Sequence, residues 1–228
     1  MEAVMPPASG AQASAPFATR ITATRRLSAN AFELTLAKPA AFVFSAGQRL
    51  RLEHAAWQRD YSIVSAPAEN DIRLCIRQVA GGRLSAHLAH AGVDACMTFT
   101  GPHGYFTFKA STRPAVFVAT GTGIAPFRAM AGSGVCGFTL LHGVKTPAEL
   151  YYREFIQTHA AVYIACLSAH RANSPAQFSG RVTDYIRNRL PPRTYDFYLC
   201  GRQDMIRDVT LLVDERFDGS LVYSEIFY

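Results

Sequence analysis

The stretch AVFVATGTGIAPF, residues 115–127, decides the fold of this 228-residue chain. Its first five residues form a continuous apolar run, which is typical of a strand buried on both faces of a parallel sheet. Gly121 and Gly123 let the backbone turn sharply, and Pro126 suits the first turn of a helix. The stretch therefore predicts a strand, a glycine-rich loop and a helix in succession.

The rest of the C-terminal half repeats this alternation. Further apolar runs predict strands over residues 137–141, 162–167, 196–199 and 221–223. Helical patterns fall over residues 127–130, 148–158, 180–188 and 203–214. Strands that alternate with helices predict a doubly wound α/β domain around a parallel sheet.

The N-terminal half has a different pattern, with short strands between turn residues. Strands are predicted over residues 20–27, 31–36, 49–52, 61–65, 72–79 and 95–100, with a helix over 85–90 that Ser85 caps. Strands of this number and spacing predict a small antiparallel β-barrel. The linker at 109–114 divides the chain into a barrel over 17–110 and an α/β domain over 111–228. Residues 1–16, rich in Ala, Pro and Ser, are expected to be a disordered leader.

The composition excludes several classes of protein. It is 49% hydrophobic and 18% charged, as in globular proteins, and no apolar run is long enough to span a membrane. The first residues lack a secretory signal, so a cytoplasmic location is expected. The net charge of +6 comes without a dense basic tract, which argues against nucleic-acid binding. The five cysteines have no metal-ligand spacing, so neither a metal site nor a built-in iron–sulfur cluster is expected; if the chain transferred electrons, its one-electron centre would lie on another protein.

Three local motifs could bind phosphates. The loop 121–123 opens a helix at the carboxyl end of a strand, where free amides attract a pyrophosphate. The tetrapeptide 59–62 offers an arginine for a phosphate and a tyrosine on the same side of a strand. Gly82 and Ser85 belong to a glycine turn that opens a helix. Each motif alone also has a purely structural explanation, as a turn, a cross-strand pair or a cap.

Together these motifs resemble the ferredoxin–NADP reductase family. The resemblance is carried by Arg-x-Tyr-Ser at 59–62, the glycine turn at 81–85, Gly-Pro-x-Gly at 101–104, Gly-Thr-Gly-x-Ala-Pro-Phe at 121–127, Cys-Gly at 200–201 and the terminal Glu-x-aromatic at 225–227. It extends over residues 17–228. It implies a flavin-binding barrel followed by an NAD(P)-binding α/β domain.

The resemblance implies a role for each matching residue. Arg59 would bind the flavin pyrophosphate with Gly82 and Ser85, Tyr61 would pack on the isoalloxazine ring, and Ser62 would hydrogen-bond near flavin N5. Gly121, Thr122 and Gly123 would lie under the phosphates of the nicotinamide nucleotide. Cys200 and Glu225 would line the nicotinamide pocket, so Ser62, Cys200 and Glu225 are the candidate catalytic residues.

Two regions depart from the family pattern. The arginine expected directly after Ser168 stands at Arg171 instead, and no acid follows that strand. We therefore favour NADPH as the co-substrate, with NADH as the alternative. The aromatic residue that covers the flavin would be Phe227 by its spacing from Glu225, or Tyr228 by its terminal position.

The sequence thus predicts an oxidoreductase with FAD, or alternatively FMN, that passes electrons between NAD(P)H and a separate ferredoxin or flavodoxin. One alternative is the reductase component of an oxygenase whose ferredoxin is a separate chain. Another is a non-enzymatic, electron-channelling flavin subunit of a larger complex, against which the intact loop at 121–127 argues.

Overall fold

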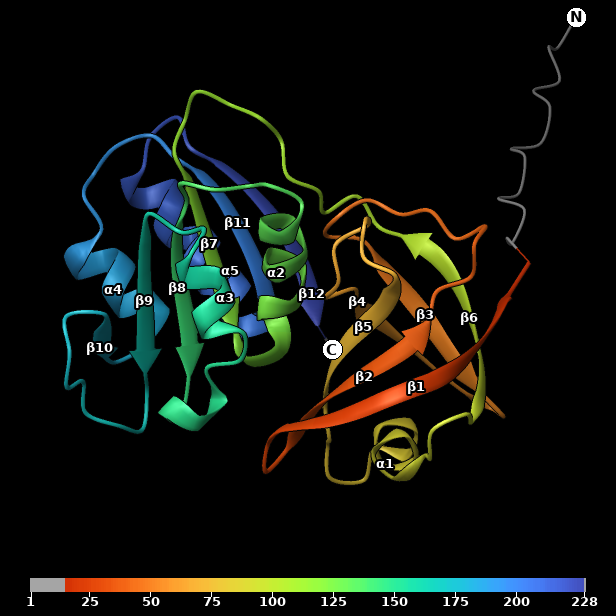
Figure 1. Cartoon of the computed structure of the whole chain (residues 1–228). Helices are drawn as coiled ribbons and strands as arrows, with labels where there is room; N and C mark the ends of the chain where they lie inside the picture. The colour runs from red at the N-terminus through yellow and green to blue at the C-terminus, as the bar shows by residue number, and fades with distance from the viewer. Residues whose placement is uncertain (1–14, 228) are drawn as a thin grey trace, which may run out of the picture.

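The computed structural model describes residues 15–227, and the side chains of residues 15–226, as two domains side by side (Figure 1). Most of the leader expected over 1–16 lies outside the described residues. Among those described, no helix is long and apolar enough to cross a membrane.

The first domain is a six-stranded antiparallel sheet with one helix. Its elements are β1 (Phe17–Ser28), β2 (Ala31–Ala37), β3 (Arg49–His54), β4 (Trp57–Ser62), β5 (Asp71–Arg77), α1 (Arg83–His90) and β6 (Cys96–His103). The strand order is β4-β3-β6-β1-β2-β5. A bridge between Ile63, directly after β4, and Leu74 of β5 joins the two edges of the sheet. The expected barrel is confirmed.

The barrel core follows the predicted alternation. Ile72, Leu74 and Ile76 of β5 are fully buried, and Phe99 of β6 lies in the same cluster. One local prediction was wrong: α1 begins at Arg83 with Gly82 as its N-cap, so Ser85 lies within the first turn. The chain turns at Gly81, which adopts φ +75°, and the N-cap lies three residues before the predicted Ser85.

The second domain is a six-stranded parallel sheet covered by helices. Its strands are β7 (Ala115–Thr120), β8 (Thr139–Val144), β9 (Val162–Leu167), β10 (Gln177–Ser179), β11 (Asp196–Arg202) and β12 (Leu221–Phe227). Its helices are η1 (Gly121–Ile124), α2 (Ala125–Gly132), η2 (Pro147–Glu149), α3 (Arg153–Gln157), α4 (Val182–Arg189) and α5 (Gln203–Arg216). The strand order is β10-β9-β8-β7-β11-β12.

Helices cover both faces of this sheet. Side chains of α2 and α3 pack on one face with Phe117, and side chains of α4 and α5 pack on the other with Val116 and Val118. Neighbouring β7 residues therefore belong to different cores, as a strand buried on both faces requires. The predicted doubly wound domain is confirmed.

Two details of this domain differ from the prediction. Strand β10 was not expected, and the helix predicted over 148–158 is broken into η2 and α3. Between them Tyr152 adopts φ +57°, and the Tyr151 hydroxyl lies 2.9 Å from Ser28 Oγ of the barrel. The backbone leaves the helical path here, where tyrosines of the α/β domain reach the barrel.

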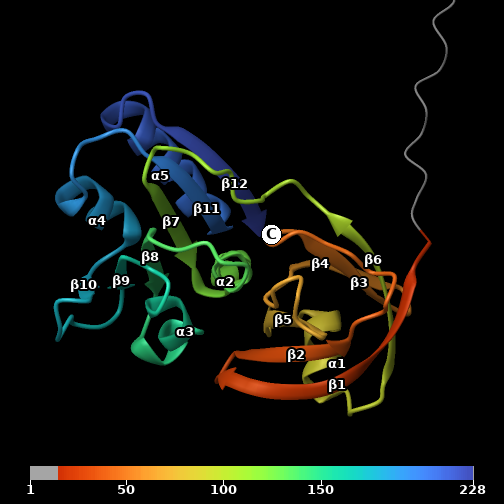
Figure 2. The ribbon, with the colours of Figure 1, turned by 45° about the horizontal axis from the view of Figure 1, so that its top comes forward.

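The two domains share a core. Val64, Cys75 and Phe106 of the N-terminal half pack in one cluster with Phe127 and Met130 of α2. Arg128 of α2 pairs with Glu69 and donates a hydrogen bond to the Val64 carbonyl at 3.3 Å. Figures 1 and 2 agree that the carboxyl end of β12 lies between the domains, near β4. The last strand of the chain thus ends at the domain junction.

Candidate active site

Ser62 and Glu225 meet at this junction. Ser62 is the last residue of β4, and its hydroxyl donates a hydrogen bond to Glu225 Oε1 of β12 at 2.6 Å. The two residues are only 3% and 6% exposed. A buried carboxylate needs hydrogen-bond donors, and for Glu225 of the α/β domain Ser62 of the barrel is such a donor. Two predicted catalytic residues, 163 positions apart, are therefore brought together.

Arg49 is a second partner of Glu225 that the sequence did not reveal. Its Nη1 lies 3.2 Å from Glu225 Oε2, and its Nε lies 3.1 Å from Asp60 Oδ2. Arg49 stands opposite Ser62 in the register of β3 and β4. Arg49 could be found only from the pairing of β3 with β4, which a local sequence pattern does not predict.

Burial sets the protonation of this cluster. Burial raises the pKa of Glu225, while the Ser62 hydrogen bond and the Arg49 guanidinium oppose that rise. Burial, with the nearby Glu225 carboxylate, also raises the pKa of the Cys200 thiol well above its usual value. Cys200 is therefore a neutral thiol at physiological pH, a small apolar wall and no thiolate nucleophile.

Cys200 and the glycine loop lie against each other. Cys200 pairs with Ala119 of β7 on one side and with Glu225 of β12 on the other. A Cβ on Gly123 would lie 2.2 Å from the Cys200 carbonyl oxygen, so only glycine fits there. The carboxyl ends of β7, β11 and β12 thus place the predicted nucleotide loop next to Cys200 and Glu225.

The loop itself starts as a single 3₁₀ turn. Gly121 adopts φ +52°, and Gly121, Thr122 and Gly123 precede the α2 helix, in which Pro126 occupies the first turn. His142 Nε2 lies 3.2 Å from the Gly121 carbonyl oxygen, and burial lowers the pKa of His142 to about 4. His142 is therefore neutral at physiological pH, and its imidazole contacts the backbone of the glycine loop.

Arg59 and Tyr61 lie on β4, on the barrel side of the same site. Arg59 is exposed, and its Nη1 donates to the Gln58 carbonyl at 2.8 Å. A guanidinium has five N–H donors, so others are available for a phosphate. Tyr61 is half-buried against the barrel core, and burial raises its pKa to about 12 despite the charge of Arg59.

The glycine turn at Gly81 and Gly82 directly precedes helix α1. Helix α1 packs against β4, and His87 of α1 stacks on His54 of β3 with ring centroids 4.0 Å apart. Gly82 has no room for a larger residue, because a Cβ would lie 2.9 Å from Ser85 Oγ and 3.0 Å from the Val79 carbonyl oxygen. The predicted phosphate residues of the barrel therefore come from two neighbouring elements.

The remaining predicted residues lie farther along the sheet or outside it. Ser168 directly follows β9, and its hydroxyl donates to the Val144 carbonyl at 3.4 Å. Arg171 is exposed in the segment after β9. Both are at the carboxyl edge of the sheet, away from Ser62. Phe227 is the last residue of β12, but its side chain, like Tyr228, lies outside the described part of the chain.

These groups fit a flavin and a nicotinamide nucleotide chemically. The barrel offers an exposed guanidinium and a partly buried aromatic ring on one strand, β4. The α/β domain offers a glycine turn with a left-handed backbone at a helix start. Phosphates and flat aromatic rings are the ligands that such groups bind.

Comparison with known families agrees with both halves of the fold. Residues 18–108 match the family model of the oxidoreductase FAD-binding domain, and residues 117–210 match that of the oxidoreductase NAD-binding domain. The fold and site therefore define a two-domain oxidoreductase with an FAD-binding and an NAD-binding half.

Individual relatives show which kinds of oxidoreductase the chain is similar to. The chain is 35% identical to ferredoxin–NADP reductase B of Sorangium cellulosum over 64% of this chain and 65% of the relative. It is 29% identical to the toluate 1,2-dioxygenase electron transfer component of Pseudomonas putida over 86% of this chain and 62% of the relative. The chain thus spans less than two thirds of each of these two relatives.

Solved structures show the same fold. A ferredoxin–NADP⁺ reductase from Neisseria gonorrhoeae with bound FAD and NADP matches with a TM-score of 0.83 at 20% identity, over 93% of this chain and 99% of that one. The matches to the FAD-binding and NAD-binding family models and to the Sorangium cellulosum reductase confirm the resemblance to the ferredoxin–NADP reductase family that the motifs predicted.

Proposed function

We propose that this chain is a flavoprotein reductase that takes hydride from NAD(P)H and passes electrons to a separate one-electron carrier. The observation that carries the proposal is the Ser62–Glu225 hydrogen bond, which joins the FAD-binding and NAD-binding halves within a buried site. Two cofactors that must touch in order to react need such a junction between their domains.

The barrel would hold the flavin. Arg59, Gly82 and Ser85 would bind its pyrophosphate, and Tyr61 would pack against its ring system. The flavin, when bound, supplies the acceptor for hydride and releases electrons one at a time. Arg59 is exposed and uses only Nη1 in its contact with the Gln58 carbonyl, so its other N–H donors are available for a phosphate.

The α/β domain would hold the nicotinamide nucleotide. Gly121, Thr122 and Gly123 would lie under its phosphates, and Cys200 and Glu225 would line the nicotinamide pocket. Ser62 and Glu225 would orient the reacting groups, and the neutral Cys200 thiol would help to exclude water. At the outer edge, Ser168 and Arg171 would meet the adenosine 2′-phosphate, which favours NADPH over NADH. Phe227 or Tyr228 would cover the flavin at the chain end.

The partner would be a ferredoxin or flavodoxin. The relative named as a ferredoxin–NADP reductase supports this reading. The dioxygenase electron transfer component among the relatives supports a second reading, in which the chain serves an oxygenase system. We place residues 17–110 in the FAD-binding part and 111–228 in the NAD(P)-binding part, and we propose a cytoplasmic location.

Purification followed by acceptor assays tests this proposal. We expect a yellow protein with about one FAD per chain that reduces a purified ferredoxin or flavodoxin with NADPH, and more slowly with NADH. A matched reaction with Ser62→Ala tests the dependence on the site. A colourless protein that binds no added FAD would overturn the proposal, and fractionation with a cytoplasmic marker tests the location.

A further inference from the structure

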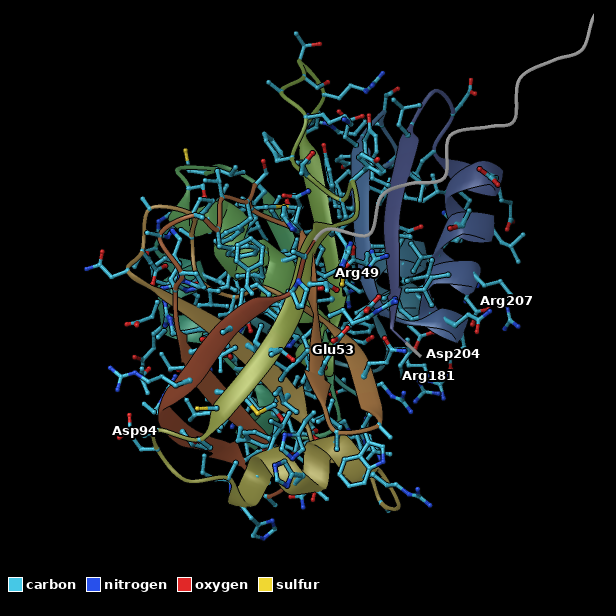
Figure 3. All side chains as sticks on the ribbon, turned by 90° about the vertical axis from the view of Figure 1, so that its right-hand side faces the viewer. Arg49, Glu53, Asp94, Arg181, Asp204 and Arg207 are labelled. Carbon is cyan, nitrogen blue, oxygen red and sulfur yellow. The ribbon has the colours of Figure 1, made fainter. Side chains whose placement is uncertain are left out.

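Arg49 occupies a bridging position between the two domains. It stands at the start of β3, and Figure 3 shows it where the barrel meets the strands of the α/β domain, away from Glu53 on the same strand. Its side chain is one third exposed, whereas that of Glu225 is 5% exposed. A surface-accessible cation thus reaches inward to a buried carboxylate of the other domain.

The guanidinium is held from two sides. Its Nε bonds to Asp60 Oδ2 at 3.1 Å, while its Nη1 reaches Glu225 Oε2 at 3.2 Å. Arg51 also pairs with Asp60, through its Nε at 2.6 Å. Asp60 therefore anchors Arg49, and the planar fork of donors lets one side chain contact two carboxylates at once.

Gly104 makes room for this arrangement. It adopts φ +84°, and a Cβ there would lie 2.7 Å from Arg49 Nη1 and 3.3 Å from Glu225 Oε2. The second glycine of the Gly-Pro-x-Gly motif thus leaves space for the Arg49–Glu225 pair. Each carboxylate oxygen of Glu225 therefore has its own partner. Oε2 accepts a hydrogen bond from Arg49, and Oε1 accepts one from the Ser62 hydroxyl.

We propose that Arg49 is a positioning residue that holds Glu225 ionised and oriented across the domain boundary, so that Oε1 stays aligned with Ser62. The inference rests on the proposed function, because the aligned pair is what the reacting cofactors would meet. Asp60 contributes to this positioning, because it belongs to the barrel and holds the Arg49 guanidinium in place.

The charged and titratable groups around Glu225 allow a sharp test. Arg49 of β3 stabilises the carboxylate, Asp60 of β4 destabilises it, and Cys200 of β11 is a neutral neighbour. Replacing Arg49 with glutamine removes the favourable charge, and loss of a nearby opposite charge raises the pKa of a carboxyl by about 1 pH unit or more. Arg51→Gln removes an equal charge that contacts Asp60 but not Glu225, so it is the matched control.

The experiment combines a titration with kinetics on the full, flavin-loaded chain. Carbon-13 NMR of labelled glutamate carboxyls, with the Glu225 signal assigned by Glu225→Gln, gives the Glu225 pKa directly. We expect Arg49→Gln to raise it, Arg49→Lys to restore it in part, and Arg51→Gln to leave it near the wild-type value. An unchanged pKa in Arg49→Gln would overturn the proposal.

Stopped-flow reduction of the flavin by NADPH supplies the second readout. Arg49→Gln should slow the step about 10- to 100-fold at saturating nucleotide, as expected when a reacting group is misplaced. In a Glu225→Gln background the same change should have little further effect, and a full additional loss there would contradict action through Glu225. A wild-type flavin that neither nucleotide reduces would refute the proposed function instead, and the NMR titration would still decide the Arg49–Glu225 link.

Discussion

Gly123 lies so close to Cys200 that a Cβ on the glycine would lie 2.2 Å from the cysteine carbonyl oxygen. The contact fixes the glycine loop that follows β7 against the carboxyl end of β11. Gly201 makes the reciprocal approach, since a Cβ there would lie 2.1 Å from Thr120 Oγ1. The two strand ends can therefore meet only without side chains at these positions.

Gly123→Ala should destabilise the protein and impair nucleotide binding. The added methyl group meets backbone atoms that cannot rotate away, and overpacking of this kind costs about 1–3 kcal/mol. Denaturant unfolding measures the loss. Gly92→Ala is the control, because no atom lies within 4 Å of a Cβ there. Equal stability of the two variants would contradict the close packing of the loop.

Arg59→Ala should weaken flavin binding with little effect on the fold. A charged hydrogen bond to a phosphate contributes roughly 1.5–3 kcal/mol, which corresponds to about a 10- to 150-fold change in the dissociation constant. Fluorescence of released flavin on dilution gives that constant. Arg26→Ala, another exposed arginine of the barrel, should leave it unchanged. Unaltered flavin retention in Arg59→Ala would remove Arg59 from the flavin site.

The stability of Glu225→Gln relative to wild type should rise with pH, and the variant should reduce its flavin more slowly. Burial raises the pKa of Glu225 in the folded state, so above pH 4.5 the folded chain holds this proton more tightly than the unfolded chain does. The contribution of Glu225 to stability is therefore present at low pH and is lost as pH rises through the folded pKa.

Thermal unfolding at several pH values checks this sign. Relative to wild type, Glu225→Gln should gain in Tm between pH 4 and pH 7, since glutamine carries no charge to bury. The matched change Glu215→Gln, at an exposed position of α5, is the control for removing a glutamate charge. A Tm difference for Glu225→Gln that is independent of pH would contradict the raised pKa.

The fold was predictable from local patterns, but the site was predictable only in part. The glycine loop and the apolar patterns identify the two domains. A strand buried on one face alternates apolar and polar residues, whereas a strand buried on both faces is a continuous apolar run. The Ser62–Glu225 contact follows from motifs at two distant positions. Arg49 could not be found this way. Its role depends on its pairing with Ser62 across two strands and on the space beside Gly104, and both residues are distant from Arg49 in the sequence.

Local chemistry also misled in two places. Ser85 has the right side chain for a helix cap, but Gly81 and Gly82 turn the chain earlier, and the serine lies inside the helix. The pattern over 148–158 is helical, but Tyr152 leaves the helical backbone where Tyr151 reaches Ser28 of the barrel. In both cases a tertiary contact or a neighbouring turn outweighed the preference of the segment.

Arg171→Ala tests the choice of nucleotide. An exposed arginine at the carboxyl edge of the sheet can contact a 2′-phosphate, which NADPH carries and NADH lacks. We expect the KM for NADPH to rise and that for NADH to stay nearly constant. Arg189→Ala, at the far end of α4, serves as the control. A similar effect on both nucleotides would assign Arg171 no part in discrimination.

Rapid anaerobic mixing of the flavin-loaded protein with nicotinamide nucleotide, followed at the flavin absorption band, tests the central claim most directly. The two-domain site with Ser62 and Glu225 at its junction predicts that the band bleaches in a single fast phase. Nucleotide deuterated at the transferred position should slow that phase, and Ser62→Ala should slow it by on the order of 100-fold while keeping the flavin bound. A flavin band that neither NADPH nor NADH bleaches would contradict the account.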